Sequence, residues 1–202
     1  MVNLILFFKN IFSFSKVKIF DKNTLVQNGK FLNSYLRISG KNNEFNLGKD
    51  SILKKANIKI KGNNNKVIIY ENCYIKEMNF EIRGENTCLI IGKNTSIQGI
   101  KIVMGRGKIE IGKDCMLSSD IEIRNTDSHK IYKGKELIND NRDIKIESNV
   151  WIGTKVIILK GSIIGKGSIV GAGSVVSGKF GDNIIIAGNP AKKIKEDIRW
   201  EV

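Results

Sequence analysis

The chain has 202 residues, with 34 Lys and Arg against 20 Asp and Glu, three cysteines and a single histidine, His129. One imidazole excludes a zinc site built from several histidines of one chain. The cysteines form no CxxC pair, so we expect no metal and a reducing, cytoplasmic compartment. Ile is far commoner than Leu or Val, at 35 against 11 each, and 20 Gly and 22 Asn supply many turn residues. This composition favours a β-rich fold over a helical one.

Residues 1–45 are basic and apolar, and we expect them to cap the fold as a separate segment. Residues 1–70 contain 13 basic and 3 acidic side chains, a net charge of +10 out of +14 for the whole chain. An apolar opening followed by this charge suits a peripheral contact with an anionic membrane, at its inner face. A solvated edge segment is the plainer alternative. Nucleic acid is not an expected partner, because aromatic residues do not alternate with the basic ones.

A repeat begins after this segment. An aliphatic residue, often followed by glycine, recurs with a small residue four positions later, and successive openings are 22, 22 and 20 residues apart. These openings are Leu47, Ile69, Ile91 and Ile111. In the C-terminal half the aliphatic residues recur at every sixth position, through Ile146, Ile152, Ile158, Ile164, Val170 and Val176.

A six-residue unit is a short strand with a tight turn, and three such units make one coil of a triangular column. The aliphatic residue fills the interior, the small residue fits the corner, and glycine tolerates the turn dihedrals. Cys73 and Cys115 occupy the small-residue position and are expected to pack there. We therefore predict an all-β fold, a parallel β-helix over residues 46–180, with a tail and a short C-terminal helix in residues 181–202.

The column is interrupted between Ile123 and Ile146, where a polar, aperiodic segment predicts an extruded loop over residues 125–145. His129 lies in this loop, two residues after Asp127. An imidazole with its ordinary pKa near 6.5 suits the role of a general base at neutral pH. Asp127 either fixes the imidazole tautomer or holds an acceptor hydroxyl.

The run IESNVWIGTKVIILKGSIIGKGSIVGAGSVVSG and the closing IAGNPAKKIK resemble the hexapeptide-repeat acyltransferases over about residues 45–195. The resemblance implies a left-handed β-helix, a homotrimer and acetyl-CoA as the acyl donor, with no metal. It also implies that small residues on the column and the lysine-bearing closing segment contact the coenzyme. These residues are Gly153, Gly171, Ala172, Gly188, Asn189, Pro190, Ala191, Lys192 and Lys193.

The DSHKIY stretch with the VWIG segment resembles, within that family, the O-acetyltransferases of capsular polysaccharide, sialic acid and related bacterial glycans. The resemblance implies that His129 is the general base and that Trp151 lines the site. Trp151 is expected to support the oxyanion or stack on a sugar, or else to pack against the next subunit, and amides near Gly153 or Trp151 are expected to stabilise the oxyanion. The loop residues expected to contact the acceptor are Asn125, Ser128, Lys130 and Tyr132.

The predicted function is therefore direct transfer of an acetyl group from acetyl-CoA to a sugar hydroxyl of a bacterial surface glycan. Two alternatives stay open on the same scaffold: N-acetylation of an amino sugar, and a non-catalytic β-helical binding protein. The N-terminal positive charge favours a polyanionic or lipid-linked acceptor.

Overall fold

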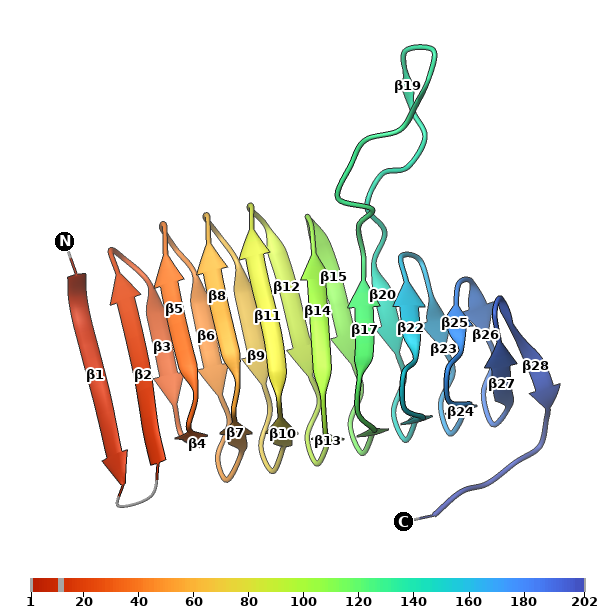
Figure 1. Cartoon of the computed structure of the whole chain (residues 1–202), viewed down its shortest axis with the longest axis horizontal. Helices are drawn as coiled ribbons and strands as arrows, with labels where there is room; N and C mark the ends of the chain where they lie inside the picture. The colour runs from red at the N-terminus through yellow and green to blue at the C-terminus, as the bar shows by residue number, and fades with distance from the viewer. Residues whose placement is uncertain (1, 11–12, 202) are drawn as a thin grey trace.

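The computed structural model describes residues 2–10 and 13–201, with side chains from residue 15 onward. Three sheets of stacked strands form the faces of a triangular column, from which a long arm projects (Figure 1). Each coil passes through sheet A, sheet B and sheet C in turn, with a left-handed sense, and most strands pair in parallel with the same strand of the next coil. The predicted all-β, left-handed parallel β-helix is confirmed.

Sheet A contains β1 (Val2–Asn10), β2 (Ser13–Phe20), β5 (Tyr35–Ser39), β8 (Asn57–Lys61), β11 (Met78–Arg83), β14 (Ile100–Met104), β17 (Ile121–Arg124), β22 (Ile157–Leu159) and β25 (Val175–Val176). Sheet B contains β3 (Thr24–Gln27), β6 (Glu44–Leu47), β9 (Lys66–Ile69), β12 (Thr87–Ile91), β15 (Gly107–Ile111), β20 (Ile144–Ile146), β23 (Ile163–Ile164) and β26 (Lys179–Phe180). Sheet C contains β4 (Lys30–Leu32), β7 (Ile52–Lys54), β10 (Tyr74–Lys76), β13 (Ser96–Ile97), β16 (Met116–Leu117), β21 (Trp151–Ile152), β24 (Ile169–Val170), β27 (Ile185–Gly188) and β28 (Ala191–Lys195). The arm contains β18 (Tyr132–Lys133) and β19 (Glu136–Leu137).

The column begins earlier than the predicted boundary at residue 46. β2 pairs in parallel with β5, β3 with β6, and β4 with β7, so residues 13–45 already form coils of the same three sheets. β1 runs antiparallel to β2 at the edge of sheet A. The basic N-terminal segment is thus not a separate cap, because its side chains alternate: Val17 and Ile19 are buried in the interior while Lys18 faces outward.

The predicted short C-terminal helix is wrong. Residues 191–195 form β28, which runs antiparallel to β27 after a turn containing the cis peptide bond Asn189–Pro190. The free edge of β27 offers backbone partners to this segment, whereas a helix of its length is marginal without a packed face. Beyond β28 the tail returns to the column, where the Ile198 N–H donates to the Asn183 carbonyl at 3.0 Å.

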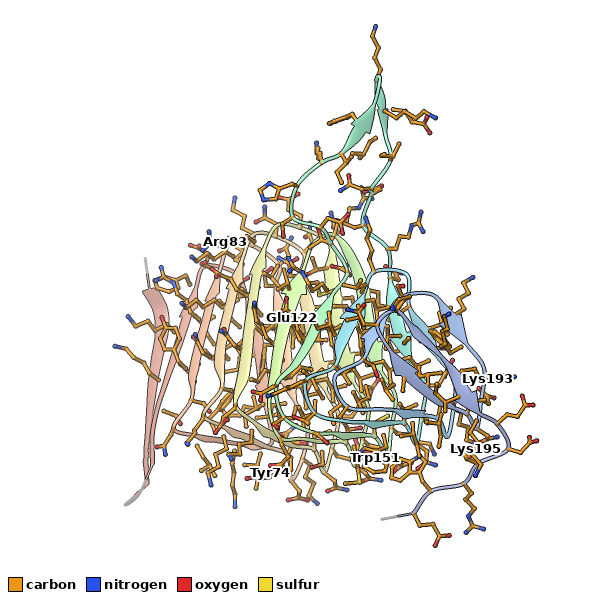
Figure 2. The ribbon with its side chains drawn as sticks, turned by 45° about the vertical axis from the view of Figure 1, so that its right-hand side comes forward. Tyr74, Arg83, Glu122, Trp151, Lys193 and Lys195 are labelled. Atoms are coloured by element: carbon orange, nitrogen blue, oxygen red, sulfur yellow. The ribbon has the colours of Figure 1, made fainter. Side chains whose placement is uncertain are left out.

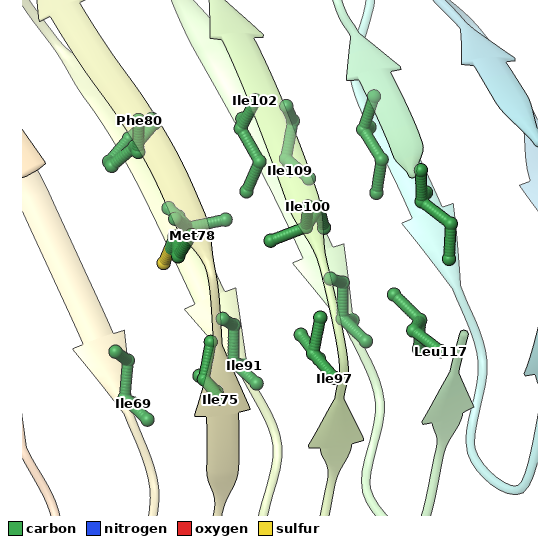
Figure 3. Packing of buried hydrophobic residues seen from close by; sticks show 14 of the residues in the cluster. Ile69, Ile75, Met78, Phe80, Ile91, Ile97, Ile100, Ile102, Ile109 and Leu117 are labelled. Atoms are coloured by element: carbon green, nitrogen blue, oxygen red, sulfur yellow. The ribbon is translucent and has the colours of Figure 1, made fainter. Parts of the chain in front are cut away.

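Stacked aliphatic side chains fill the interior of the column (Figure 3). The six residues of the period-six run have no exposed surface, which confirms the register read from the sequence. Cys73 and Cys115 are buried at a corner, as predicted, and burial raises the pKa of the Cys115 thiol to about 11. Both thiols are therefore packing groups rather than nucleophiles at neutral pH.

The glycines that follow the aliphatic residues have a different role from the predicted one. A Cβ added to Gly48, Gly92 or Gly112 would lie 2.5 to 2.6 Å from backbone atoms of the next coil, so these glycines permit close stacking. The left-handed turn conformation falls instead on Asn and Asp two positions later, such as Asn94 and Asp114, with φ of 57° and 58°. Asn and Asp tolerate this region better than other side chains, which accounts for much of the Asn content.

An asparagine ladder stabilises the corner between sheets A and B. The Asn65 side chain donates to Asn43 Oδ1 at 3.0 Å and to the Gly84 carbonyl at 2.9 Å, and its own Oδ1 accepts from Thr87 N and Thr87 Oγ1 at 3.1 and 2.8 Å. Asn43, Asn65 and Thr87 are at most 2% exposed. The polar groups of three consecutive coils are thereby satisfied without water.

The Asn65→Ala variant is expected to lower the free energy of unfolding by roughly 2 to 4 kcal/mol, because it leaves several buried polar groups without partners. Urea unfolding followed by circular dichroism measures the loss. Asn46→Ala, at an outward position of β6, is the matched control and should change stability by less than about 0.5 kcal/mol. Equal effects of the two substitutions would contradict the role given to the ladder.

Candidate active site

The arm leaves the column at the corner between sheets A and B, between the end of β17 and the start of β20 (Figure 1). Its tip is the two-stranded hairpin β18–β19, turned at Gly134 with φ of 61°. Ile131, Tyr132 and Ile138 on the arm are each about half exposed, at 52%, 52% and 50%. Three large apolar side chains thus project into solvent, away from the body of their own chain.

Asn125 begins the arm but is fully buried. Its Oδ1 accepts from Gly105 N at 2.8 Å, and its Nδ2 donates to the carbonyls of Gly105 and Arg106 at 3.3 and 3.4 Å. The prediction that Asn125 contacts an acceptor is therefore corrected: the side chain replaces backbone partners where the chain leaves the coil.

Lys160 joins the two ends of the arm. It lies after β22 in the next coil, its side chain is 19% exposed, and its Nζ donates to Asp127 Oδ2 at 2.6 Å and to the Asn139 carbonyl at 2.8 Å. Asn139 in turn donates to Asp127 Oδ2 at 2.9 Å and to the His129 carbonyl at 2.7 Å. We call Lys160, Asp127 and Asn139 the clasp. It fixes the backbone on both sides of His129.

Asp127 thus has a different partner from the predicted one. Hydrogen bonds from Lys160 and then Asn139 hold the pKa of the Asp127 carboxyl below its ordinary value. Within the described residues the Asp127 carboxylate accepts hydrogen bonds from Lys160 and Asn139, not from the imidazole of His129. Asp127 therefore positions the arm rather than the tautomer of the imidazole.

Because the pKa of Asp127 is depressed in the folded chain, its contribution to arm order is present above the ordinary carboxyl pKa and is lost as pH falls through the depressed value. At neutral pH, Lys160→Met should accelerate hydrogen exchange of the Ile131 and Ile138 amides by about three- to tenfold. Lys166→Met, on an exposed turn at the next corner of the same coil, is the control and should leave both rates unchanged. Unchanged exchange in Lys160→Met would show that the arm is held by other contacts.

His129, Ser128 and Lys130 are exposed on the arm next to the outer face of sheet A. Ser128 has φ of 66°, and its Oγ lies 3.5 Å from Arg124 Nη2. A cleft of about 500 Å³ lies beside this point and is lined by Arg83, Lys101, Thr126 and Ser128, among others. Glu81 also lines this cleft and pairs with Arg83 at 2.9 Å, and Lys101 pairs with Glu122 at 3.2 Å, so both cations of the cleft have acidic partners. Ser128, which precedes His129, lines the cleft, while Tyr132 lies farther out in the hairpin.

Trp151 lies on the outer face of sheet C, between Met116 and Ile169 of the neighbouring strands, and is 41% exposed. Its ring packs against Trp200, with centroids 6.1 Å apart and planes inclined by 47°. The Trp200 Nε1–H donates to the Asn149 carbonyl at 3.0 Å. Trp200 is a site neighbour that the sequence did not indicate, because the predicted helix placed it elsewhere.

One chain does not bring His129 and Trp151 together. The arm rises from the corner between sheets A and B, and Trp151 is on sheet C, the face opposite that corner; Figure 2 shows Trp151 and the arm on opposite sides of the column. The two residues can share one site only if they come from different subunits.

The predicted oxyanion donors are already used. Trp151 N donates to the Ser168 carbonyl at 3.0 Å and Gly153 N to the Val170 carbonyl at 2.8 Å. Both amides belong to the ladder of sheet C, so they cannot stabilise an oxyanion. A donor for that role has to come from a side chain or another backbone position.

The predicted coenzyme residues divide into packed and open positions. A Cβ on Gly153 would lie 2.7 Å from Ala172 N, and one on Gly171 would lie 2.9 Å from Ala187 Cβ, so stacking explains both glycines. Ala191 is 8% exposed. Ala172, Gly188, Asn189, Pro190 and Lys192 are exposed at the C-terminal end, and Lys193 forms an ion pair with Glu196.

Comparison with known proteins agrees with this architecture. Residues 143–178 match the family model described as bacterial transferase hexapeptide (six repeats). The crystal structure of the polysialic-acid-specific acetyltransferase NeuO superposes with a TM-score of 0.82 at 35% identity, covering 91% of this chain and 84% of that one. The structure of the polysialic acid O-acetyltransferase OatWY superposes with a TM-score of 0.86 at 36% identity, covering 89% of this chain and 88% of that one. The chain belongs to the hexapeptide-repeat acyltransferase family.

Curated members of this hexapeptide-repeat family match over shorter stretches. A polysialic acid O-acetyltransferase of Escherichia coli O1:K1 is 46% identical over 104 residues, which is 50% of this chain and 34% of that protein. The enzyme of the same name from Neisseria meningitidis is 55% identical over 58 residues, 28% of this chain and 27% of that protein. The matched stretches thus span about a third of the length of these curated relatives.

Residues 2–10 and 13–201 contain no group of three or more His, Cys, Asp or Glu side chains placed to hold a metal ion. No helix within these ranges is long and apolar enough to cross a membrane.

Proposed function

We propose that this protein transfers an acetyl group from acetyl-CoA to a hydroxyl of an anionic, sialic-acid-type surface glycan. The observation that carries the proposal is the match, over most of both chains, to two structures whose names state polysialic acid acetylation. The exposed imidazole of His129, one residue from a cleft that Arg83 and Lys101 line, supports it, because this chemistry needs a base and an anionic acceptor needs cations.

In the proposed reaction, acetyl-CoA supplies an acyl group activated as a thioester. His129 accepts the proton of the acceptor hydroxyl while the hydroxyl oxygen forms a bond to the carbonyl carbon. The imidazolium then returns this proton to the departing sulfur as the carbon–sulfur bond breaks, so that no acyl-enzyme is needed. The clasp supports this step by holding the His129 backbone at the cleft.

We further propose a homotrimer in which His129 of one subunit meets Trp151 of the next. Their separation within one chain supports this, as do the exposed apolar side chains of the arm, which have their partners elsewhere. Trp151 is 41% exposed and Ile157 on sheet A is 36% exposed, which suits burial between subunits. The indole then contributes an aromatic wall and an N–H donor.

The C-terminal end of the column fits the coenzyme. Ala172 and Gly173 form an open corner, since a Cβ added to Gly173 would meet nothing within 4 Å. Lys192 lies exposed on β28 close to this end, and a lysine there can bind phosphate. Among the predicted coenzyme residues, Ala172, Gly188, Asn189 and Lys192 therefore stay in the proposal as contacts.

Incubation of the purified protein with acetyl-CoA and a panel of sialylated, uronic and neutral saccharides tests the function. We expect free thiol to form with polysialic acid and the product to contain an ester, which mild base removes. An acetyl group that resists base would indicate an amide on an amino sugar. Thiol release without any acceptor preference for anionic sugars would contradict the assigned acceptor.

A further inference from the structure

Sheet A carries rows of positive charge on its outer face. Side chains alternate between the interior and the outside along each strand, and parallel register places the outward residues of successive coils in rows along the column. One row runs through Lys18, Arg37 and Lys59, and the next through Lys61 and Arg83. Neighbouring strands lie about 4.8 Å apart, so these cations are stacked at that spacing.

Such stacking of like charges destabilises a sheet. Sheet B avoids it in the same coils, where Lys66 pairs with Glu44 of the adjacent strand at 3.0 Å. On sheet A, Glu81 forms ion pairs with two cations, Lys61 at 3.3 Å and Arg83 at 2.9 Å. Lys18, Arg37 and Lys59 precede Glu81 in their row without an intervening carboxylate. With Glu81 included, these positions of the two rows therefore keep a net positive charge.

Both rows lead toward the arm. The cleft that Ser128 lines is also lined by Glu81 and Arg83 of β11 and by Lys101 of β14, which pairs with Glu122 at 3.2 Å. Figure 2 shows Arg83 at the edge of the column from which the arm rises. The row through Lys61 and Arg83 therefore reaches the cleft that Ser128, the residue before His129, also lines. The row through Lys18, Arg37 and Lys59 meets Glu81 at the same cleft.

We propose that this face, the cationic track (Lys18, Arg37, Lys59, Lys61 and Arg83), binds an extended anionic polysaccharide and directs it to His129. The inference rests on the proposed function and adds the route of the acceptor. A polymer with a carboxylate on each sugar matches cations arranged in rows, and outward Asn57 and Asn79 beside the track offer amides to sugar hydroxyls. The track lies on a flank and ends at the arm, which suits a polymer better than a lipid surface.

The double variant Lys59→Gln/Lys61→Gln tests the track in the full-length chain. The KM for polysialic acid, divided by the KM for a single sialic acid, should rise about five- to tenfold, since two exposed ion pairs are lost. Lys30→Gln/Lys54→Gln removes the same charge from sheet C in neighbouring coils and should change the ratio less than about twofold. Lys18→Gln/Arg83→Gln is a second track variant in case the first folds poorly, as judged by thermal melting.

Binding of polysialic acid without acetyl-CoA, measured across a salt series, separates the track from the reaction. If no acceptor is acetylated but the polymer still binds more weakly to the track variant than to the control, the proposed function fails and the track stands. Equal polymer binding by both double variants would overturn the track. So would a track variant that loses binding only to phosphatidylserine vesicles, because the face would then be a lipid-binding surface.

Discussion

Replacing His129 with alanine is expected to lower kcat by about 10²- to 10⁴-fold, the contribution of a positioned general base. The chain contains no second imidazole to take over the proton. Acetyl-CoA-dependent thiol release with polysialic acid measures turnover, and calorimetry measures coenzyme binding, which should be unchanged because the proposed coenzyme contacts lie at the C-terminal end of the column.

The control is Lys135→Ala, which removes an exposed side chain from the turn of the β18–β19 hairpin, outside the predicted acceptor contacts. It should keep kcat within a few-fold of the unmodified protein. Full activity of His129→Ala would exclude this residue as the base. A parallel loss of coenzyme binding would instead indicate that the arm has moved, and hydrogen exchange at Ile131 would report that movement directly.

Coexpression of His129→Ala and Trp151→Ala chains should restore activity that neither variant has alone. If each site combines His129 of one subunit with Trp151 of the next, every trimer that contains both variants has about one site in three with both residues intact. Differently tagged chains, purified through both tags, give the mixed oligomers, and thiol release measures their turnover.

The matched control mixes two differently tagged His129→Ala chains, which cannot form an intact site and should stay inactive. Mixed oligomers of the two different variants that also stay inactive would contradict a shared site. A monomeric chain with full activity would do so too, because the two side chains lie on opposite sides of one column.

The interior of the column was predictable where its residues are uniform. From Ile146 to Val176 each inward position is aliphatic at a spacing of six, so the register was evident. In the first coils Phe31 and Phe45 fill the interior instead, with ring centroids 6.1 Å apart, and the aliphatic period is lost there. This is why the predicted start of the column fell too late.

The site was predictable only in part, because its supports are distant in sequence. The break in the repeat indicated the arm and His129, whereas Lys160 stands in the repeat as an ordinary outward lysine. Its contact with Asp127 joins residues 33 positions apart. The Trp151–Trp200 contact likewise depends on where the C-terminal tail returns to the column. Residues 191–195 form a strand rather than a helix because they pair with the free edge of β27.

The antiparallel direction of β28 against β27 also limits growth of the fold. A β-helix lengthens by adding parallel strands to the last coil, and an open last coil can accept a strand from another molecule. In sheet C the final strand runs the opposite way, and its segment carries Lys192, Lys193 and Lys195. A further coil cannot continue sheet C in register, and the lysines repel an incoming copy. The hairpin therefore acts as a terminator that keeps columns from joining end to end.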